Sequence, residues 1–304
     1  MIPIAATIAV ATAVGIFGEQ RYGAAAEAAT ARLMRALIWL LLPVVAFFNI
    51  AALELTAEVG AGIAYGYVAI AVCMTAAWAI GKHVLHLSRP AVGALILAAG
   101  LANTGYLGIP FTAALFGLDD IPNAVVYDLL VSTMALITIG FSVGAAFGTV
   151  AEAPRDRVIA FLTRNPPLWA TIAGFLAPDA LAPDWAVEAS QVLVFLILPI
   201  GFFAVGVTLA AESERDGIGF PPPLTRPVGV ALALRLLVAP AVVYGLSQLV
   251  LDVPDPYVSQ AAMATAINSL AVANEYGLDR PLCAEAIAWS TAIVVAAGLV
   301  LALL

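Results

Sequence analysis

The sequence predicts an all-α polytopic membrane protein whose ten transmembrane helices form two inverted five-helix repeats. Of its 304 residues, 63% are hydrophobic and only 11% are charged, whereas a soluble domain of this length carries about 25% charged residues. Mean hydropathy is +1.04, and apolar runs of about 17 to 25 residues, enough to cross a bilayer, recur from end to end. The runs are continuous rather than alternating, which excludes a transmembrane β-barrel.

Hydropathy and helix-breaking residues delimit ten segments. They cover residues 2–18, 33–53, 60–81, 91–117, 123–149, 165–177, 187–210, 227–250, 257–275 and 282–303. No Lys or Arg precedes the first apolar run, so it lacks the basic region of a cleavable signal peptide and is expected to be retained. The sixth segment, NPPLWATIAGFLA, is short for a transmembrane helix. The distribution of basic residues nevertheless indicates that it crosses the membrane.

All twelve basic residues lie in or beside alternate loops of this ten-helix arrangement. They are Arg21, Arg32, Arg35, Lys82, Arg89, Arg155, Arg157, Arg164, Arg215, Arg226, Arg235 and Arg280. The other loops carry acids such as Glu54, Glu58, Asp119, Asp120, Asp179, Asp184, Asp252 and Asp255. Because basic loops stay in the cytoplasm, we expect an inner-membrane protein with both termini in the periplasm. Without the sixth helix, Arg215, Arg226 and Arg280 would lie on the periplasmic side.

Three residues inside the apolar segments are expected to be structural. Arg235 lies about 12 Å along the eighth segment from Pro227, where snorkelling to the cytoplasmic interface is the favoured interpretation and a substrate contact the alternative. No basic side chain is therefore expected at the middle of the bilayer. Cys73 and Cys283 lie in apolar sequence and are expected to be small buried hydrophobic residues, not a disulfide or a metal site.

The two halves of the chain resemble each other. LLPVVAFF at 41–48 corresponds to LILPIGFF at 196–203, and LFGLDD after the fourth segment corresponds to YGLDR after the ninth. Both offsets are near half the chain length, and five helices per copy is an odd number, so the second copy must be inverted. We therefore expect repeats at 1–149 and 165–304 joined by a cytoplasmic linker at 150–164. Inverted repeats characterise secondary transporters.

The stretch LANTGYLGIP in the fourth segment predicts an interrupted helix. Gly105 and Gly108 allow an irregular backbone and Pro110 removes a helix hydrogen bond, while Asn103 and Thr104 supply polar partners for the freed groups. An unwound segment survives in a bilayer only where it lines a cavity or is buried in protein. A simple kink in a packing helix is the alternative.

A second interruption is predicted in the ninth segment, where Asn268 and Ser269 break the apolar run of MATAINSLAVANEYG. Half-helix N-termini carry partial positive charge and unpaired N–H groups, so they favour an anion. With no basic side chain expected nearby, the anion would be held by helix ends and asparagine amides.

The residues that carry these features resemble those of the auxin efflux carrier family of membrane transport proteins, which includes the plant PIN-FORMED carriers. The matching stretches are NTGYLGIP, LPIGFFAVGVTLA and INSLAVANEYGLDRPLCAEAIAWST. The resemblance implies a ten-helix inverted-repeat fold related to bile acid–sodium symporters, in which helices 4 and 9 are broken and cross. It also implies scaffold helices 1, 2, 6 and 7 that form a homodimer, transport helices 3–5 and 8–10, and organic carboxylates, among them auxin and malonate, as substrates.

Two departures from the family pattern are visible. Ala264 stands where the family usually has a proline, and the linker at 150–164 is short, as in bacterial forms. The positions carried over as the substrate site are Asn103 and Asn268, with Ser269 beside the latter. Thr104, Gly105 and Pro110 are expected to shape the first crossing.

A cation-coupling group is expected in the fifth helix. Asp128 is an acid inside a span, about 9 Å from Pro122, and functional by default, with an interfacial acid as the alternative. Ser132, one turn further on the same face, and Thr133 beside it offer oxygen ligands for a hard cation. The coupling ion is expected to be Na⁺ or H⁺, with no other cofactor. Glu275 near the end of the ninth segment is either an interfacial cap or a coupling group.

These observations favour a secondary transporter of small organic carboxylate anions, with export as the expected direction. Sodium-coupled uptake and a carrier-fold receptor without transport are the alternatives. An intramembrane enzyme is disfavoured because the segments hold no paired acids, HExxH motif or nucleophile elbow. No nucleic acid partner is expected without a basic face.

Overall fold

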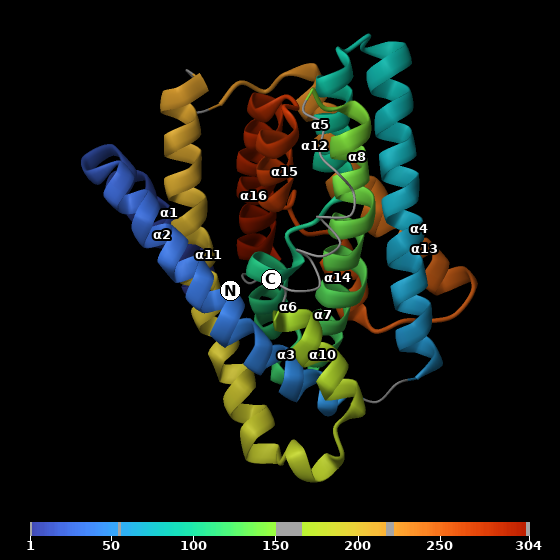
Figure 1. The fold of residues 1–304 in the computed structure, drawn as a ribbon. Coiled ribbons are helices and arrows are strands. Elements are labelled where there is room, and N and C mark those ends of the chain that lie inside the picture. Colours follow the sequence, from blue (N-terminus) through green and yellow to red (C-terminus); the bar gives the residue numbers. More distant parts are fainter. Residues whose placement is uncertain (1, 54–55, 150–165, 217–221, 302–304) are drawn as a thin grey trace.

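The computed structural model describes residues 2–53, 56–149, 166–216 and 222–301, and every regular element in them is a helix (Figure 1). The first half contains α1 (Ile2–Tyr22), α2 (Ala24–Ala36), η1 (Leu37–Leu41), α3 (Leu42–Ala51), α4 (Ala57–Ala79), η2 (Ile80–Val84), α5 (Arg89–Gly100), η3 (Thr104–Gly108), α6 (Ile109–Leu115), η4 (Leu118–Asp120), α7 (Ile121–Val126), η5 (Tyr127–Thr133), η6 (Leu136–Gly140) and α8 (Phe141–Phe147). The second contains α10 (Pro166–Leu176), η7 (Asp179–Leu181), α11 (Asp184–Asp216), α12 (Arg226–Ala233), η8 (Leu234–Val238), α13 (Ala239–Leu249), α14 (Asp255–Ala261), α15 (Asn268–Tyr276) and α16 (Arg280–Leu301). The linker predicted at 150–164, its three arginines and Glu54 lie outside the described residues.

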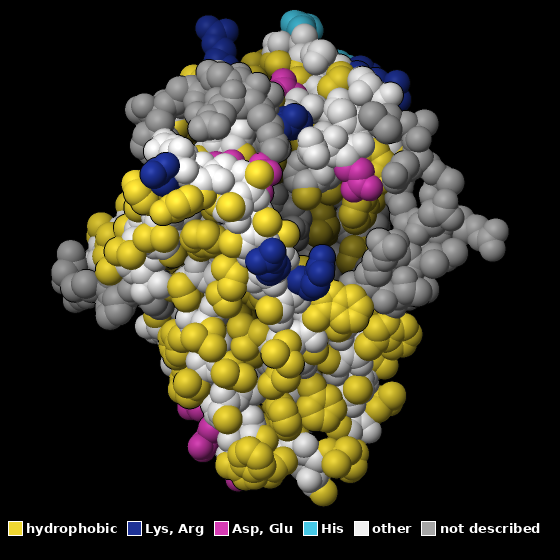
Figure 2. All heavy atoms as spheres, turned by 60° about the vertical axis from the view of Figure 1, so that its left-hand side comes forward, with side chains coloured by type: hydrophobic (Ala, Val, Ile, Leu, Met, Phe, Trp, Pro, Cys, Tyr) yellow, Lys and Arg dark blue, Asp and Glu magenta, His cyan; other side chains and the backbone are white. Residues whose placement is uncertain are grey.

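Six helical stretches are long and apolar enough to cross a membrane, which confirms a helical multi-pass membrane protein. They are Ala24–Ala51, Ala57–Val84, Leu118–Phe147, Asp184–Ala211, Arg226–Leu249 and Arg280–Leu301. Two shorter apolar helices, α5 and α10, fall on the predicted fourth and sixth segments. On the face shown in Figure 2 hydrophobic side chains prevail, as expected of a surface in contact with lipid. The count of ten spans and the inversion of the repeats stay predictions.

π-helical turns allow three helices to accommodate proline. Pro43, Pro110 and Pro240 each lie two residues after such a turn, which is η1, η3 and η8 respectively. Proline lacks an N–H and its ring collides with the carbonyl four residues earlier. A π turn closes its hydrogen bonds over five residues and widens the helix at that point, so the chain continues as a helix through all three prolines.

The second helix begins nine residues before its predicted start. Gly23 has φ +48, which permits a tight reversal after α1, and α2 follows at once at Ala24. The sequence AAAEAATARLMRA consists almost wholly of strong helix formers, so the helix extends well beyond the apolar part that hydropathy detects.

The helices gather into two groups in Figure 1. In one group α1 and α2 lie against α11, and α10 packs on α3. A Cβ atom at Gly15 would overlap the carbonyl of Phe203, and one at Gly206 would overlap that of Thr12, so small residues allow close backbone approach. In the other group α4 packs on α5 and α13, and α5 packs on α16.

The chain is interrupted between α5 and η3 and again between α14 and α15, and these two interruptions contact each other. The backbone N–H of Asn103 donates to Ala264 O at 2.7 Å, and that of Ala266 donates to Leu101 O at 2.9 Å. Ala102 and Thr265 form an antiparallel bridge between these two bonds. This contact, called the crossing below, satisfies backbone groups that neither broken helix can satisfy alone. The second interruption lies just before its predicted place, because Asn268 and Ser269 already begin α15.

Candidate functional site

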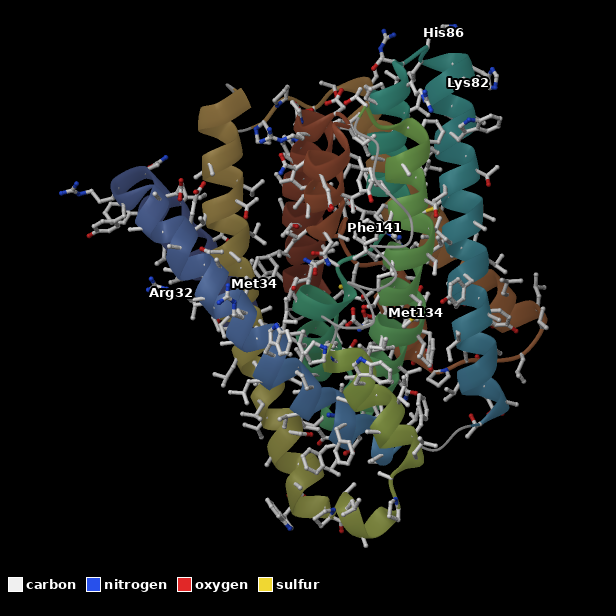
Figure 3. The ribbon with its side chains drawn as sticks, in the orientation of Figure 1. Arg32, Met34, Lys82, His86, Met134 and Phe141 are labelled. Carbon is white, nitrogen blue, oxygen red and sulfur yellow. The ribbon has the colours of Figure 1, made fainter. Side chains whose placement is uncertain are left out.

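Two adjoining cavities lie beside the crossing, with volumes of about 470 Å³ and 90 Å³. Both are lined by Leu42, Tyr106, Asp128, Thr133, Leu136 and Asn268. The smaller cavity reaches the crossing itself, where residues 101–105 and 266–268 contribute to its wall. The larger cavity extends along a mostly apolar wall to Glu275 on α15. Phe141 of α8 belongs to that wall (Figure 3), with its ring centroid 6.1 Å from that of Tyr276. One continuous site is thus formed at the crossing.

Asp128 is tied to the first interruption. Oγ1 of the buried Thr104 donates a 2.5 Å hydrogen bond to Oδ1 of Asp128. Gly105 permits this approach, because a Cβ atom there would lie 3.1 Å from both carboxylate oxygens. Asp128 belongs to the π-helical η5. Because a π turn spans more residues than an α turn, both Ser132 and Thr133 follow Asp128 on the cavity side.

Asn103 brings a buried polar group without a partner to the site. Its side chain is 4% exposed and lines the smaller cavity. Its Nδ2 has no hydrogen-bond partner among the described residues, although its own carbonyl accepts from the N–H of Gly108 at 3.1 Å. An unsatisfied buried donor costs about 1–3 kcal/mol, and such groups in native proteins call for an explanation. A ligand acceptor in the cavity would satisfy this amide.

Asn268 is the first residue of α15 and lines both cavities. Backbone N–H groups at a helix start carry partial positive charge. The two asparagines predicted for the substrate site therefore line one cavity. They lie 165 positions apart in the sequence, and the crossing brings them together. A carboxylate placed between them would meet amide donors and a helix N-terminus.

The other predicted site residues take different places. Glu275 is exposed and lines the larger cavity. Ser269 is fully buried outside both linings, with Oγ donating to Leu97 O at 3.4 Å. Pro110 lies within α6 rather than at the break and lines neither cavity, because η3 continues directly into α6. Sequence reasoning missed Tyr106, which lines both cavities and packs against Gly201.

The expectation that Arg235 snorkels to an interface is wrong. Arg235 is 2% exposed, and its Nη1 donates to Gly100 O at 2.9 Å while its Nη2 donates to Ala261 O. The carbonyl groups that end a helix lack intrahelical partners, and here they bind the guanidinium. A basic side chain therefore does lie next to the crossing, although it lines neither cavity. Cys73 and Cys283 are free and buried, as predicted.

Comparison with known proteins gives matches to transporters. Residues 155–301 match the family described as membrane transport protein. An uncharacterised transporter of Methanocaldococcus jannaschii is 26% identical over 225 residues, covering 69% of this chain and 68% of the relative. An uncharacterised transporter of Methanothermobacter thermautotrophicus is 27% identical over 203 residues, covering 65% of this chain and 63% of the relative. These matches confirm the resemblance found in the motifs: residues 155–301, a little less than half of the chain, are similar to the membrane transport protein family.

Proposed function

We propose that this protein is a secondary transporter that moves organic carboxylate anions by alternating access, with the substrate bound between Asn103 and Asn268. The observation that carries the proposal is the cavity at the crossing, where the unpartnered Nδ2 of Asn103 and the start of α15 face one space. The similarity to this family and to the two archaeal transporters supports transport as the activity. Export is the proposed direction.

The crossing supports the ten-helix inverted repeat as the underlying architecture. The interruptions at 101–103 and 262–267 contact each other through two reciprocal backbone hydrogen bonds. Such an exchange is what a two-fold axis in the membrane plane would produce. We propose repeats at 1–149 and 165–304, with α1, α2, α3, α10 and α11 forming a scaffold through which a homodimer assembles.

The wall of the larger cavity favours a carboxylate with a hydrophobic body. Apart from Glu275, its polar groups lie near the crossing, and the remainder is formed mainly by Ile38, Leu42, Val45, Ile109, Val125, Leu129, Ile137, Phe141 and Val272. Its volume of about 470 Å³ lies within the usual range for small-molecule sites, about 300–1,000 Å³. A monocarboxylate with an aromatic or branched body fits this division better than a small dicarboxylate, whose second charge would face apolar side chains.

Asp128 supports coupling to a cation. A substrate carboxylate and an ionised Asp128 in one cavity would repel each other, and the low dielectric would strengthen that repulsion. Either a proton on Asp128 or a sodium ion held by Asp128 with Thr104, Ser132 and Thr133 would remove the conflict. Sodium-coupled uptake is thus the second candidate function, and its supporting observation is the group of oxygens beside Asp128.

Flux in proteoliposomes tests the proposal. Purified protein is reconstituted in vesicles loaded with unlabelled benzoate, and entry of radiolabelled benzoate or malonate is followed against protein-free vesicles. Counterflow of benzoate exceeding that of malonate is the expected result. Saturable binding without counterflow would instead indicate a receptor, and flux only in the presence of sodium would favour the symporter.

A further inference from the structure

The guanidinium group of Arg235 connects the two interrupted helices. Gly100 is the last residue of α5 and Ala261 is the last residue of α14. Arg235 donates one hydrogen bond to each of their carbonyl groups. One side chain from η8 therefore contacts both breaks, on residues directly preceding the segments that form the crossing.

The charge of Arg235 complements these two helix ends. A helix C-terminus carries a partial negative charge of roughly half an elementary unit. Two such ends side by side repel each other, and together they approach the charge of one guanidinium. The planar fork of arginine also reaches two separate acceptors, which an ammonium group does less well.

Within the described part of the chain, the surroundings of Arg235 contain no other explanation for its charge. Its hydrogen-bond acceptors among the described residues are the two backbone carbonyls. Among the described residues, the phenol of Tyr127 and the thiol of Cys73 are the ionisable groups beside it. Both are ordinarily neutral at pH 7, and Cys73 donates to Leu234 O. Burying a charge is costly unless it is compensated, so the carbonyl groups at the breaks are the compensation.

We propose that Arg235 is a structural cation at the crossing. It holds the C-terminal ends of α5 and α14 together and neutralises their partial negative charge. It is a positioning residue, since it lines neither cavity. The N-terminal ends of η3 and α15, at Thr104 and Asn268, border the smaller cavity. The binding of a substrate anion at these ends rests on the function proposed above. The clamp, by which we mean the two hydrogen bonds from Arg235 to Gly100 and Ala261, does not depend on that function.

Hydrogen exchange of the two breaks, measured by mass spectrometry on the full-length protein in detergent, tests the clamp. The backbone N–H groups of Asn103 and Ala266 report on the crossing, in peptides covering 97–110 and 258–270. Arg235→Met removes the charge at similar size, and Arg235→Lys keeps the charge. Arg226→Met, on an exposed arginine at the start of α12, is the matched control for loss of one positive charge.

Arg235→Met is expected to speed exchange in both peptides by about 10- to 100-fold, the range for hydrogen bonds to a charged group. Arg235→Lys should retain most of the protection, and Arg226→Met should behave like the parent. If the Met variant yields no folded protein, a folded and protected Lys variant still supports the role of charge. Equal behaviour of the Met and Lys variants, whether both are protected, both are unprotected or both fail to fold, would overturn the proposal. So would loss of protection in one peptide alone.

Binding of benzoate tests the link to the anion site separately. In the parent protein a measurable Kd is expected, weakened about tenfold or more in Arg235→Met and less in Arg235→Lys. An unchanged Kd in Arg235→Met would show that the clamp does not serve anion binding. Absence of benzoate binding in the parent would count against the proposed substrate, while the exchange experiment would still decide the clamp.

Discussion

Thr104 and Asp128 join the first interruption to the helix that follows it, through a 2.5 Å hydrogen bond from Oγ1 to Oδ1. Thr104 is the first residue after the break, and Asp128 lies in the π-helical η5. A change in the charge of Asp128 is therefore felt directly where the substrate is proposed to bind. In the proposed function, this hydrogen bond links the substrate site to the group that would bind the coupling ion.

Asp128→Asn should abolish coupling to a cation while keeping the protein folded, because the asparagine oxygen still accepts from Thr104. If sodium is the coupling ion, sodium raises the melting temperature of the parent but not of the variant. If the coupling ion is a proton, anion binding varies with pH in the parent and not in the variant. Asp119→Asn, an exposed acid, is the control. A variant that keeps both responses would make Asp128 an acid without a coupling role.

Asn103→Ala and Asn268→Ala should each weaken anion binding by about tenfold or more, the loss of one hydrogen bond to a charged group. Folding should be preserved, and Asn103→Ala is expected to be neutral or stabilising because it removes a donor that has no partner. Melting temperature and Kd are measured together. Asn274→Ala, at an exposed position of α15, the helix that Asn268 begins, is the matched control. Parent-like binding in both variants would place the anion elsewhere.

Gly105→Ala should impair anion binding and cation coupling together. The added methyl group would lie 3.1 Å from both oxygens of Asp128, closer than relaxed packing allows, so the carboxylate must turn away from Thr104. Gly60→Ala in α4, where a Cβ atom meets nothing within 4 Å, should leave both properties unchanged. Flux with and without the cation gradient provides the measurement, and wild-type coupling in Gly105→Ala would argue against a fixed Thr104–Asp128 contact.

Ala264→Pro should yield folded protein, although Ala264 is fully buried. The crossing uses the carbonyl of Ala264, and the same irregular stretch uses the N–H of Ala266. Proline removes an N–H but keeps the carbonyl. Ala266→Pro is therefore the contrasting variant, expected to lose about 1–3 kcal/mol of stability from the orphaned Leu101 carbonyl. Thermal unfolding compares the two, and a more damaging effect at position 264 than at 266 would contradict the observed hydrogen-bond pattern.

The predicted orientation is tested with reporters. A fluorescent protein that matures only in the cytoplasm, fused after the last residue, should stay dark because the one-sided distribution of basic residues predicts that both termini lie in the periplasm. The same reporter inserted into the linker at 150–164 should fluoresce. A bright C-terminal fusion would mean that the number of spans is odd or that the orientation is reversed.

The sequence was a good guide where local chemistry decides the structure. Glycine and asparagine in LANTGYLGIP predicted an interruption, and the spacing of Asp128 and Ser132 predicted that they share a face, with Thr133 at its edge. The exact position of the second break was harder, because proline is absent at Ala264 and Asn268 is compatible with a helix start. Arg235 was misjudged, since its partners are carbonyl groups of Gly100 and Ala261. Every residue has a backbone carbonyl group, so the sequence does not reveal which of these groups will bind an arginine.

The paired interruptions have a consequence for biosynthesis. The N–H of Asn103 and the carbonyl of Leu101 find their partners at Ala264 and Ala266, which leave the ribosome far later. At about 5–20 residues per second, the first break waits roughly 8–30 s for the second. Throughout that interval its polar backbone must be shielded by water, lipid head groups or the insertion machinery. Truncation before residue 264 should therefore leave a nascent chain that quality-control proteases recognise, even though most of its helices are already made.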